Sequence, residues 1–438
     1  MLQDIVIGLL AAGVLLGAAP VCAADPPTAS VAADNDLGLP PPSSAARDRL
    51  DRVRDSVVQV RGFFGDSQAD AFHGSGFAAS TGGLFVTNYH VVLAAVLYPR
   101  QYRLEFLAPN GANGKLSVHA IDVEHDLAIV KAENHSPAPI RIRTQIPGKG
   151  ERAYSIGFPL DLGLTITEGV ANGLVENSLE QRIHYSGAMN GGMSGGPALD
   201  NAGAAYGVNV SVITGRQLVS FVVPAKHIAA LLARAQQPLD LTGARTLVST
   251  QLTSHQAALF ASIPDQLASE PSGGYALPAK VAASFECNSD GSADASKPLR
   301  VEAIGCAARV GIFVEDGLET GDIRFQHRIL ETDKLHPLQF AEQINRVAVS
   351  VTWGGSAKHV APFACTTKVV ALRGFDARVG TCVRQYRMFA NLYDIGVVIV
   401  SLNASQRAVV SNLNLRGVAF DSGMNFVRRY LGALQWNP

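Results

Sequence analysis

The sequence predicts a mainly β protein in which two antiparallel barrels of six strands each precede an α+β region that contains disulfides. Two observations lead to this expectation. Short apolar segments, separated by Gly, Asn, Asp and Pro turns, recur regularly between residues 57 and 223. Beyond residue 240, strand-like segments are followed by helical patterns, and four of the five cysteines lie there. Regularly spaced short strands are typical of closed barrels, whereas mixed strands and helices are typical of an α+β domain.

The strand-like segments of the barrels form two sets of six. The first set is 57–64, 72–79, 83–87, 102–107, 115–122 and 127–132. The second set is 151–157, 164–177, 181–187, 196–200, 203–210 and 217–223. Each set has enough strands to close one small barrel, and ligand sites tend to form in the cleft between two such units.

Helical patterns flank the two barrels. Residues 45–58 place Leu50, Val53 and Val57 at helical spacing among charged residues, which predicts a short amphipathic helix. Residues 226–235 predict a helix that packs back on the barrels. We therefore expect one domain at 45–238 and a C-terminal domain at 239–438, because a single domain usually has about 100 to 200 residues.

The N-terminal residues predict export. Residues 5–19 are apolar and are followed by Val-Cys-Ala-Ala, which suits signal-peptidase cleavage after Ala23 or Ala24. The stretch before them carries Asp4 and no Lys or Arg, so an uncleaved anchor or a different start codon stays open. Residues 1–24 are assigned to a signal peptide, and 25–44, rich in Pro, Ala and Asp, to a flexible linker. We expect a periplasmic or secreted protein, with no membrane span in the mature chain if the signal is cleaved.

Composition limits the classes of function. A formal net charge of −1 gives no electrostatic case for binding nucleic acid or an anionic membrane surface. Several histidines lie without the spacing of metal ligands, so we assign no metal and no cofactor. These are His73, His119, His125, His135 and His184.

A serine among glycines is the strongest chemical signal in the chain. Residues 190–197 read Asn-Gly-Gly-Met-Ser-Gly-Gly-Pro, a loop that bends until two N–H groups face one point beside the Ser194 hydroxyl. His90 and Asp126 lie upstream, which gives the order His, Asp, Ser of one type of catalytic triad. The Gly-x-Ser-x-Gly pattern also fits the nucleophile elbow of α/β-hydrolases, but that fold needs a helix after Ser and then Asp and His downstream. The turn at 200–203 leads instead into another strand.

Five motifs in order resemble the trypsin-like serine peptidases, and their wording is nearest to the bacterial HtrA-type branch. Together they make the resemblance specific over residues 50 to 235, and nothing beyond residue 240 is covered by it. The motifs are Gly-Ser-Gly-Phe at 74–77, Val-Thr-Asn-Tyr-His-Val-Val at 86–92, Asp-Leu-Ala-Ile-Val-Lys at 126–131, Gly-Met-Ser-Gly-Gly-Pro at 192–197 and Phe-Val-Val-Pro at 221–224.

The resemblance implies a peptide or protein substrate and assigns a role to each residue. Ser194 attacks the scissile carbonyl, His90 removes and later returns the proton, and Asp126 orients the imidazole. The N–H groups of Gly192 and Ser194 hold the oxyanion. Met193 stands where zymogen-activated relatives carry an aspartate that pairs with a newly cut N-terminus. We therefore expect no activating cleavage and an oxyanion loop that is ordered by local packing or by a partner.

Substrate preference is carried over from the resemblance in the same way. The floor of the pocket for the P1 side chain falls on Ala188, and its walls fall on Asn209, Val210, Ser211 and Val212. None of these residues is acidic, so we expect a preference for small or medium apolar P1 side chains rather than for Lys or Arg.

The C-terminal half carries its own pattern. Four cysteines in an exported chain allow three pairings, and we favour Cys287–Cys306 and Cys365–Cys382 because each encloses a segment of hairpin length. The similar contexts of the two pairs suggest two related lobes of about 80 residues, although chance similarity stays open. No PDZ signature is present, so the role of this half is not predicted.

Two functions from different classes follow. The first is an exported serine endopeptidase with an acyl-enzyme intermediate. The second is a silent or partner-activated trypsin-like protein that acts as a binding module. The complete set of His90, Asp126, Ser194 and the glycine-rich loop favours the enzyme, since a binding module has no chemical need for all of them.

Overall fold

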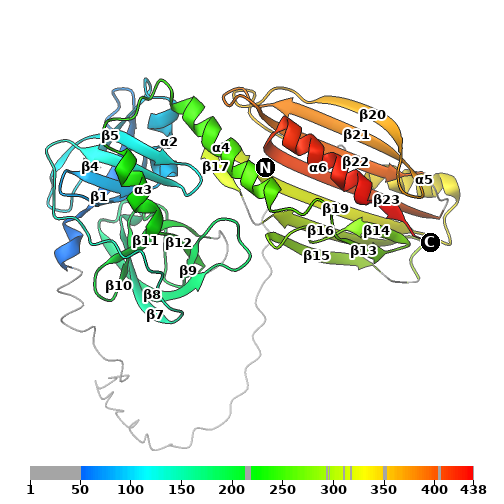
Figure 1. The fold of residues 1–438 in the computed structure, drawn as a ribbon, viewed down its shortest axis with the longest axis horizontal. Helices are drawn as coiled ribbons and strands as arrows, with labels where there is room; N and C mark the ends of the chain where they lie inside the picture. The colour runs from blue at the N-terminus through cyan, green and yellow to red at the C-terminus, as the bar shows by residue number, and fades with distance from the viewer. Residues whose placement is uncertain are drawn as a thin grey trace, which may run out of the picture. The chain divides into compact units, whose positions relative to one another are not determined.

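The computed structural model describes residues 51–437 apart from 213–218, 293, 295, 309–310, 316–317, 349–352 and 403–405. The expected signal peptide, the linker and the first part of the helix at 45–58 lie outside the described residues; residues 51–54 of that helix are helical. Ser44–Pro438 is one compact unit, which contains two closed barrels and a seven-stranded sheet (Figure 1). The predicted fold class is therefore confirmed.

The first barrel has the strand order β1-β2-β3-β6-β5-β4. Its strands are β1 (Val57–Phe64), β2 (Asp70–Ala78), β3 (Leu84–Thr87), β4 (Tyr102–Leu107), β5 (Asn113–Asp122) and β6 (Leu127–Ala132). Helix α2 (Tyr89–Leu97) lies between β3 and β4, and six of its nine residues are buried. A helix that is apolar on nearly all sides is covered on more than one face, and α2 contacts both this barrel and elements of the C-terminal half.

The second barrel has the strand order β10-β11-β12-β9-β8-β7. Its strands are β7 (Glu151–Gly157), β8 (Thr165–Leu174), β9 (Ile183–Tyr185), β10 (Pro197–Asp200), β11 (Ala205–Val212) and β12 (Ser220–Pro224), and a short 3-10 helix, η1 (Pro159–Asp161), follows β7. All twelve strands coincide with predicted segments. The segments predicted at 164–177 and 181–187 are shorter in the structure, because a turn with Asn177 at φ 56° separates β8 from β9.

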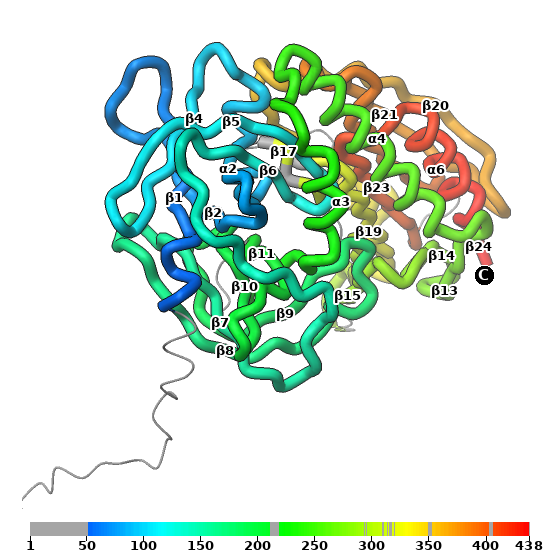
Figure 2. The backbone as a smooth tube through the Cα atoms, turned by 60° about the vertical axis from the view of Figure 1, so that its left-hand side comes forward, coloured from blue at the N-terminus to red at the C-terminus, as the bar shows by residue number. Residues whose placement is uncertain are grey.

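Two helices follow the barrels. The predicted helix at 226–235 is α3 (Lys226–Arg234), which buries Ile228 and Leu231. Helix α4 (Ala244–Ala261) contacts both α2 and the last helix, α6 (Phe420–Ala433), and Figure 2 shows it crossing from the first barrel to the C-terminal sheet. None of the helices among the described residues is long and apolar enough to cross a membrane.

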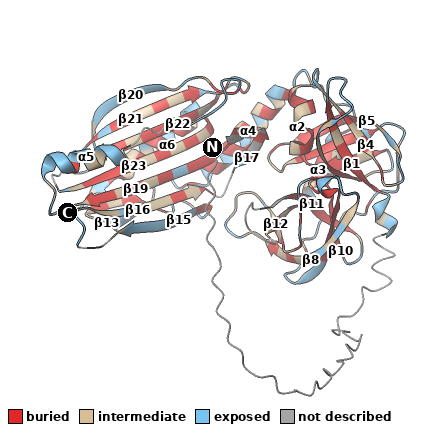
Figure 3. Ribbon diagram, turned by 180° about the vertical axis from the view of Figure 1, so that it is seen from behind, coloured by how far each residue is buried: buried red, intermediate tan, exposed pale blue. Residues whose placement is uncertain are grey.

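The C-terminal half is built on one antiparallel sheet with the order β15-β16-β19-β23-β22-β21-β20. Its strands are β15 (Phe285–Ser292), β16 (Arg300–Ala308), β19 (Asp322–Glu331), β20 (Ala364–Ala371), β21 (Asp376–Gln385), β22 (Leu392–Ser401) and β23 (Arg407–Ala419). The smaller elements are β13 (Ser269–Ser272), β14 (Tyr275–Pro278), β17 (Ile312–Glu315), β18 (Leu318–Thr320), α5 (Pro337–Val347) and β24 (Gln435–Trp436). The central strands are mostly buried, whereas β20 is almost entirely exposed (Figure 3).

The two disulfides pair as expected. Cys287 bonds to Cys306 and Cys365 bonds to Cys382. Each pair joins residues that lie directly opposite each other, in the hairpins β15–β16 and β20–β21. These hairpins form the two ends of one sheet. The idea that they belong to two duplicated lobes stays a prediction.

One hydrophobic core connects the first barrel to the C-terminal half. It contains Val92 and Val96 of α2, Val248 of α4, and Ile312 and Val314 of β17. Because these side chains share a single cluster, the surface of α2 that the barrel leaves uncovered is buried by residues from beyond position 240.

Candidate active site

His90 and Asp126 are joined by two hydrogen bonds. The imidazole Nδ1 lies 2.7 Å from Asp126 Oδ2, and the main-chain N–H of His90 donates to Asp126 Oδ1 at 2.9 Å. An ionised carboxylate only accepts hydrogen bonds, so Nδ1 carries the proton and Nε2 is the nitrogen that can take another. The first turn of α2 and the β5–β6 loop therefore fix the imidazole as a proton acceptor.

The Asp126 loop is held from both sides. Asp126 has φ 56°, a left-handed conformation that few residues other than glycine adopt. The side-chain amide of Asn88 donates to the Asp126 carbonyl at 2.7 Å, and Arg182 donates to the His125 carbonyl at 3.2 Å. These two contacts stabilise the unusual backbone that aims the carboxylate at His90.

The Ser194 segment bends at two glycines in the left-handed region. Gly192 has φ 96° and Gly195 has φ 88°. A Cβ on Gly192 would lie 2.2 Å from the Phe158 carbonyl oxygen, and one on Gly195 would lie 2.1 Å from the Ser75 carbonyl oxygen. Both positions therefore require glycine, for space as well as for conformation.

The carbonyl groups of this segment are bound by the rest of the barrels. The Ser75 hydroxyl donates to Gly192 O at 2.7 Å, the Ser75 N–H donates to Ser194 O at 2.7 Å, and the Leu160 N–H donates to Gly191 O at 3.0 Å. Within the described part of the chain, the N–H groups of Gly192 and Ser194 donate to no protein acceptor. They are thus left to bind an anion from outside the chain.

The Ser194 hydroxyl donates to the Val210 carbonyl at 3.1 Å. A hydroxyl has a single proton, so in this structure the proton is directed at β11 and not at His90. The hydroxyl would have to rotate and redirect its proton before His90 could accept it.

A cavity of about 350 Å³ adjoins the imidazole. It is lined by His90, Val123, Glu124, Asp126, Glu180, Arg182, Val210, Gly311 and Ile312. The ends of both barrels and the first residues of β17 thus meet around one space. A second cavity also includes His90, together with other residues of α2 and with Lys358 and His359 from the C-terminal half.

Charges around the cavity act on the imidazole. Burial lowers the pKa of His90, but the charge of Asp126 and its hydrogen bond raise it by more, so the pKa of His90 lies above its ordinary value. The positive charge of Arg182 opposes this rise. Burial also raises the pKa of Glu180, whose carboxylate lies 3.2 Å from Arg182.

The residues expected to bind the P1 side chain have different environments. Ala188 is exposed, whereas Asn209 is fully buried and its amide donates to the Ile156 carbonyl at 3.1 Å. Val210 lines the cavity beside His90. The side chains of Ser211 and Val212 lie outside the described residues. The assignment of a P1 pocket to these residues stays a prediction.

Several site residues were missed by the sequence reasoning. Asn88 lies two residues before His90, so its place in the histidine motif was a usable signal. Arg182 and Glu180 lie in the segment between β8 and β9, where the sequence contains no recognisable motif. Gly311 and Ile312 lie more than 180 residues beyond the histidine motif in a region that the resemblance does not cover, so only the fold brings them to the site.

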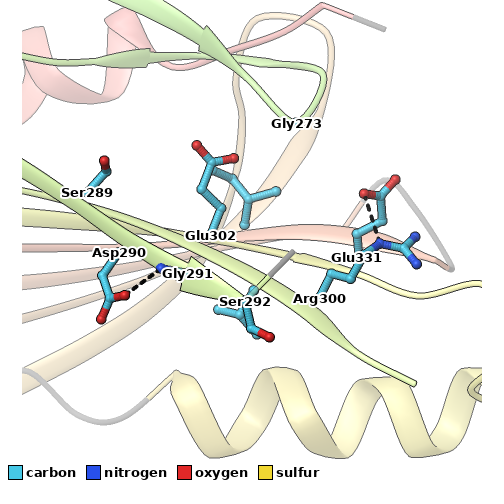
Figure 4. Close-up of a pocket in the computed structure, with 10 residues that line it drawn as sticks. Gly273, Ser289, Asp290, Gly291, Ser292, Arg300, Glu302 and Glu331 are labelled. Carbon is cyan, nitrogen blue, oxygen red and sulfur yellow. Dashed lines mark hydrogen bonds and ion pairs between the residues drawn. The ribbon is translucent and has the colours of Figure 1, made fainter. Parts of the chain in front are cut away.

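Another cavity, of about 510 Å³, lies on the C-terminal sheet and shares no residue with the site around His90. Figure 4 shows its polar lining from β15, β16 and β19, in which Arg300 faces Glu331. Their Nε and Oε2 atoms are 3.7 Å apart, so this cation is paired within the chain. Among the described residues, no group of three or more His, Cys, Asp and Glu side chains is arranged to hold a metal ion.

Residues 74–208 match the family model described as the trypsin-like peptidase domain. The chain is 30% identical to human serine protease HTRA4 over 199 residues, covering 42% of this chain and 40% of that protein. It is 29% identical to mitochondrial serine protease HTRA2 of Drosophila willistoni over 231 residues, covering 46% and 52%. The chain therefore spans about half or less of the length of these curated relatives. The family and sequence matches confirm the resemblance that the motifs predicted.

Solved structures also match. The serine endoprotease from Yersinia pestis is 24% identical, with a TM-score of 0.39, over 44% of this chain and 67% of that chain. A protease from M. tuberculosis in its active form is 22% identical, with a TM-score of 0.40, over 46% and 91%.

Proposed function

We propose, from the premise that residues 74–208 match a trypsin-like peptidase domain with relatives among HtrA serine proteases, that this chain is a serine endopeptidase. One observation carries the proposal. His90 and Asp126 are joined by two hydrogen bonds, and they line the same cavity as Val210. The carbonyl of Val210 accepts the hydrogen bond from the Ser194 hydroxyl. An acceptor nitrogen, a hydroxyl and two N–H groups that have no acceptor among the described residues are the parts that acyl transfer to serine requires.

The proposed reaction has two halves. Ser194 Oγ attacks the scissile carbonyl while His90 Nε2 takes the hydroxyl proton, and the resulting oxyanion binds the N–H groups of Gly192 and Ser194. His90 then donates the proton to the leaving amine, and an acyl-enzyme is left on Ser194. Water, deprotonated by His90, hydrolyses that ester and restores the hydroxyl.

The packing of Met193 supports a catalytic loop that forms without activating cleavage. Met193 is buried in a cluster with Tyr185, Met189 and Tyr206. A thioether in an apolar cluster needs no ionic partner, so the segment is ordered by contacts within the barrel.

Ala188 and Val210 support a preference for small or medium apolar P1 side chains, since neither side chain supplies a negative charge for Lys or Arg.

Export is part of the proposal. Disulfides persist in oxidising compartments and are rare in the cytosol, and this chain has two. A periplasmic or secreted enzyme would meet unfolded or extracellular proteins as substrates.

One observation favours the alternative of a partner-activated protein. Because the Ser194 hydroxyl donates to Val210 O, the hydroxyl needs a rotation that redirects its proton before the serine can act. If that rotation required a bound partner, the isolated chain would bind peptides without cleaving them.

Hydrolysis of a generic unfolded protein tests the two functions against each other. The wild-type protein should cleave it, and the Ser194→Ala variant should lose about 10⁶-fold in kcat. Cleavage sites mapped by mass spectrometry should follow small or medium apolar residues, and sites after Lys or Arg would overturn the P1 preference. Equal cleavage by both proteins, or none by a folded wild type, would contradict the endopeptidase.

A further inference from the structure

The start of β17 and the residue before it reach the cavity beside the imidazole, although they lie far along the chain from the barrels. Gly311 and Ile312 share this cavity with His90, Val123 and Val210. Ile312 is buried and belongs to the same hydrophobic core as α2, the helix that begins beside His90. The C-terminal half thus supplies a packed side chain, that of Ile312, to the cavity wall.

The cavity has one apolar side and one charged side. Val123, Val210 and Ile312 provide aliphatic surface, whereas Glu180 and Arg182 form an ion pair at 3.2 Å. Asp126 is bonded to His90 in the same way, and Glu124 adds a half-buried carboxylate on the charged side. An uncharged side chain therefore gains from the aliphatic side of this space. A volume of about 350 Å³ is at the lower end of the range for ligand pockets.

The place of the cavity fixes which part of a substrate can enter it. It borders both the imidazole and Val210, whose carbonyl binds the Ser194 hydroxyl. Successive side chains of an extended peptide point to opposite faces. The P2 side chain of such a peptide would therefore face away from the P1 pocket predicted at Ala188, and the cavity beside the imidazole is the space that can receive it.

We propose that Ile312 is a specificity-determining residue that walls the subsite for the P2 side chain, so that the C-terminal half selects substrates. This proposal rests on the endopeptidase function proposed above. It assigns to β17 a role that the peptidase match at residues 74–208 does not contain.

Two substitutions at Ile312 should act in opposite directions. Ile312→Ala enlarges the subsite. It should raise by about tenfold the ratio of kcat/KM for peptides with Leu or Phe at P2 to kcat/KM for peptides with Ala at P2, because one methylene in an apolar pocket changes kcat/KM by about 10- to 200-fold. Ile312→Phe fills the subsite and should lower the same ratio. Both variants should still react with a fluorophosphonate at Ser194, since neither alters the hydroxyl or its base.

Val314 provides the matched control. It lies two residues along the same strand, it is fully buried in the same core, and it is not among the residues that line the cavity. Val314→Ala should also lower the free energy of unfolding, by somewhat less than Ile312→Ala because it removes one carbon fewer, without changing the P2 ratio.

The measurement is a set of peptides that differ at P2 alone, assayed with the full-length protein and all three variants. Opposite shifts at residue 312 with no shift at residue 314 would support the proposal. The proposal would be overturned if the wild type cleaves but the Ile312 variants leave the P2 ratio unchanged. It would also be overturned if Val314→Ala changes that ratio equally. Either result would leave the proposed endopeptidase function standing. A folded wild type that neither cleaves nor reacts with the fluorophosphonate would overturn both.

Discussion

The two barrels contain no cysteine and no edge strand, whereas the C-terminal sheet has two edge strands, β15 and β20, and a disulfide beside each of them. A closed barrel pairs every strand on both sides. An open sheet leaves the outer N–H and C=O groups of its edge strands without strand partners. The disulfides therefore lie where strand pairing ends, and each one joins an edge strand covalently to its neighbour.

The same two regions differ in chemistry. The proposed triad and oxyanion groups all lie in the barrel half, between His90 and Ser194. The C-terminal half reaches them through α4 and β17, which contribute to the hydrophobic core around α2. We therefore expect substitutions in the barrels to change the reaction rate, and substitutions at the sheet edges to change stability alone.

After Ser194→Ala, the largest effect is expected from Asp126→Asn. An amide can donate to Nδ1 and so impose the wrong tautomer on His90, which should lower kcat about 10⁴-fold. The matched control is Asp122→Asn, because the Asp122 carboxylate binds the ring of a different histidine, His125, at 2.9 Å. Steady-state kinetics with a peptide substrate would measure both. Equal losses in the two variants would mean that Asp126 acts only through loop stability.

The next effect is expected from Gly192→Ala. The added methyl group meets the Phe158 carbonyl in a left-handed backbone, so the N–H of residue 192 should turn away from the oxyanion. Loss of one such donor lowers kcat by about 10²- to 10³-fold. Gly191→Ala is the control, because a Cβ there has no atom within 4 Å. If kcat fell equally in both variants, the oxyanion role of residue 192 would be wrong.

The edge of the C-terminal sheet gives a stability effect. The double variant Cys365→Ser with Cys382→Ser removes a link between residues 17 apart, which should lower the free energy of unfolding by about 3 kcal/mol. Denaturant titration would measure this loss. Under conditions in which the variant stays folded, kcat should equal that of the wild type. A fall in kcat with folding intact would show that the sheet edges and the barrels are not separable.

A smaller effect is expected at a contact that joins the two regions. The side chain of Gln251 on α4 accepts from the Val123 N–H at 2.7 Å and donates to the Ile121 carbonyl at 3.2 Å. Gln251→Ala leaves both groups without these partners and should lower the free energy of unfolding by about 1 to 3 kcal/mol. Thr250→Ala, an exposed change on the same helix, should leave it unchanged. Equal unfolding free energies for the two variants would show that the hydrogen bonds from α4 to the first barrel do not stabilise the fold.

The smallest effect is the position of the acidic limb in the pH profile of kcat/KM. His90 must be neutral to accept a proton, and Asp126 holds its pKa above 6.5 against the opposing effect of burial. Activity should therefore rise with pH through a midpoint above 6.5. Asp126→Asn removes both causes of the rise, so its residual activity should have a lower midpoint. A wild-type midpoint below that of the variant would reverse the assigned role of the carboxylate.

The stability that His90 contributes has the opposite pH dependence. A folded-state pKa above the unfolded value means that the protonated imidazole stabilises the fold fully at pH below about 6.5, and that this contribution is lost as pH rises through the folded pKa. Rising activity and falling stability over the same interval would identify one group as the cause of both.

The sequence predicted the barrels well, because short strands with regular turns and an ordered set of motifs leave few alternatives. The disulfide pairing was also predictable, since each pair spans the length of one hairpin. The single sheet that joins both hairpins was not, because strand order depends on contacts between residues that lie far apart in the chain.

The predictable and unpredictable parts of the candidate site divide in the same way. Asn88 could have been found from its place before His90, and the glycine at 192 from its motif. Arg182 and Ile312 could not, because a hydrogen bond to a carbonyl or a wall of a cavity leaves no pattern in the sequence. One signal was available in α2, which is apolar on nearly all sides. Such a helix must be covered by more than the barrel from which it emerges.

Labelling with a fluorophosphonate tests the central claim most directly, because the probe reacts only where a serine hydroxyl, its base and an oxyanion site act together. We expect the uncleaved, purified protein to be modified at Ser194, as mapped by mass spectrometry, and the His90→Ala variant to stay unmodified. A wild type that is folded by circular dichroism and carries no label at Ser194 would contradict it.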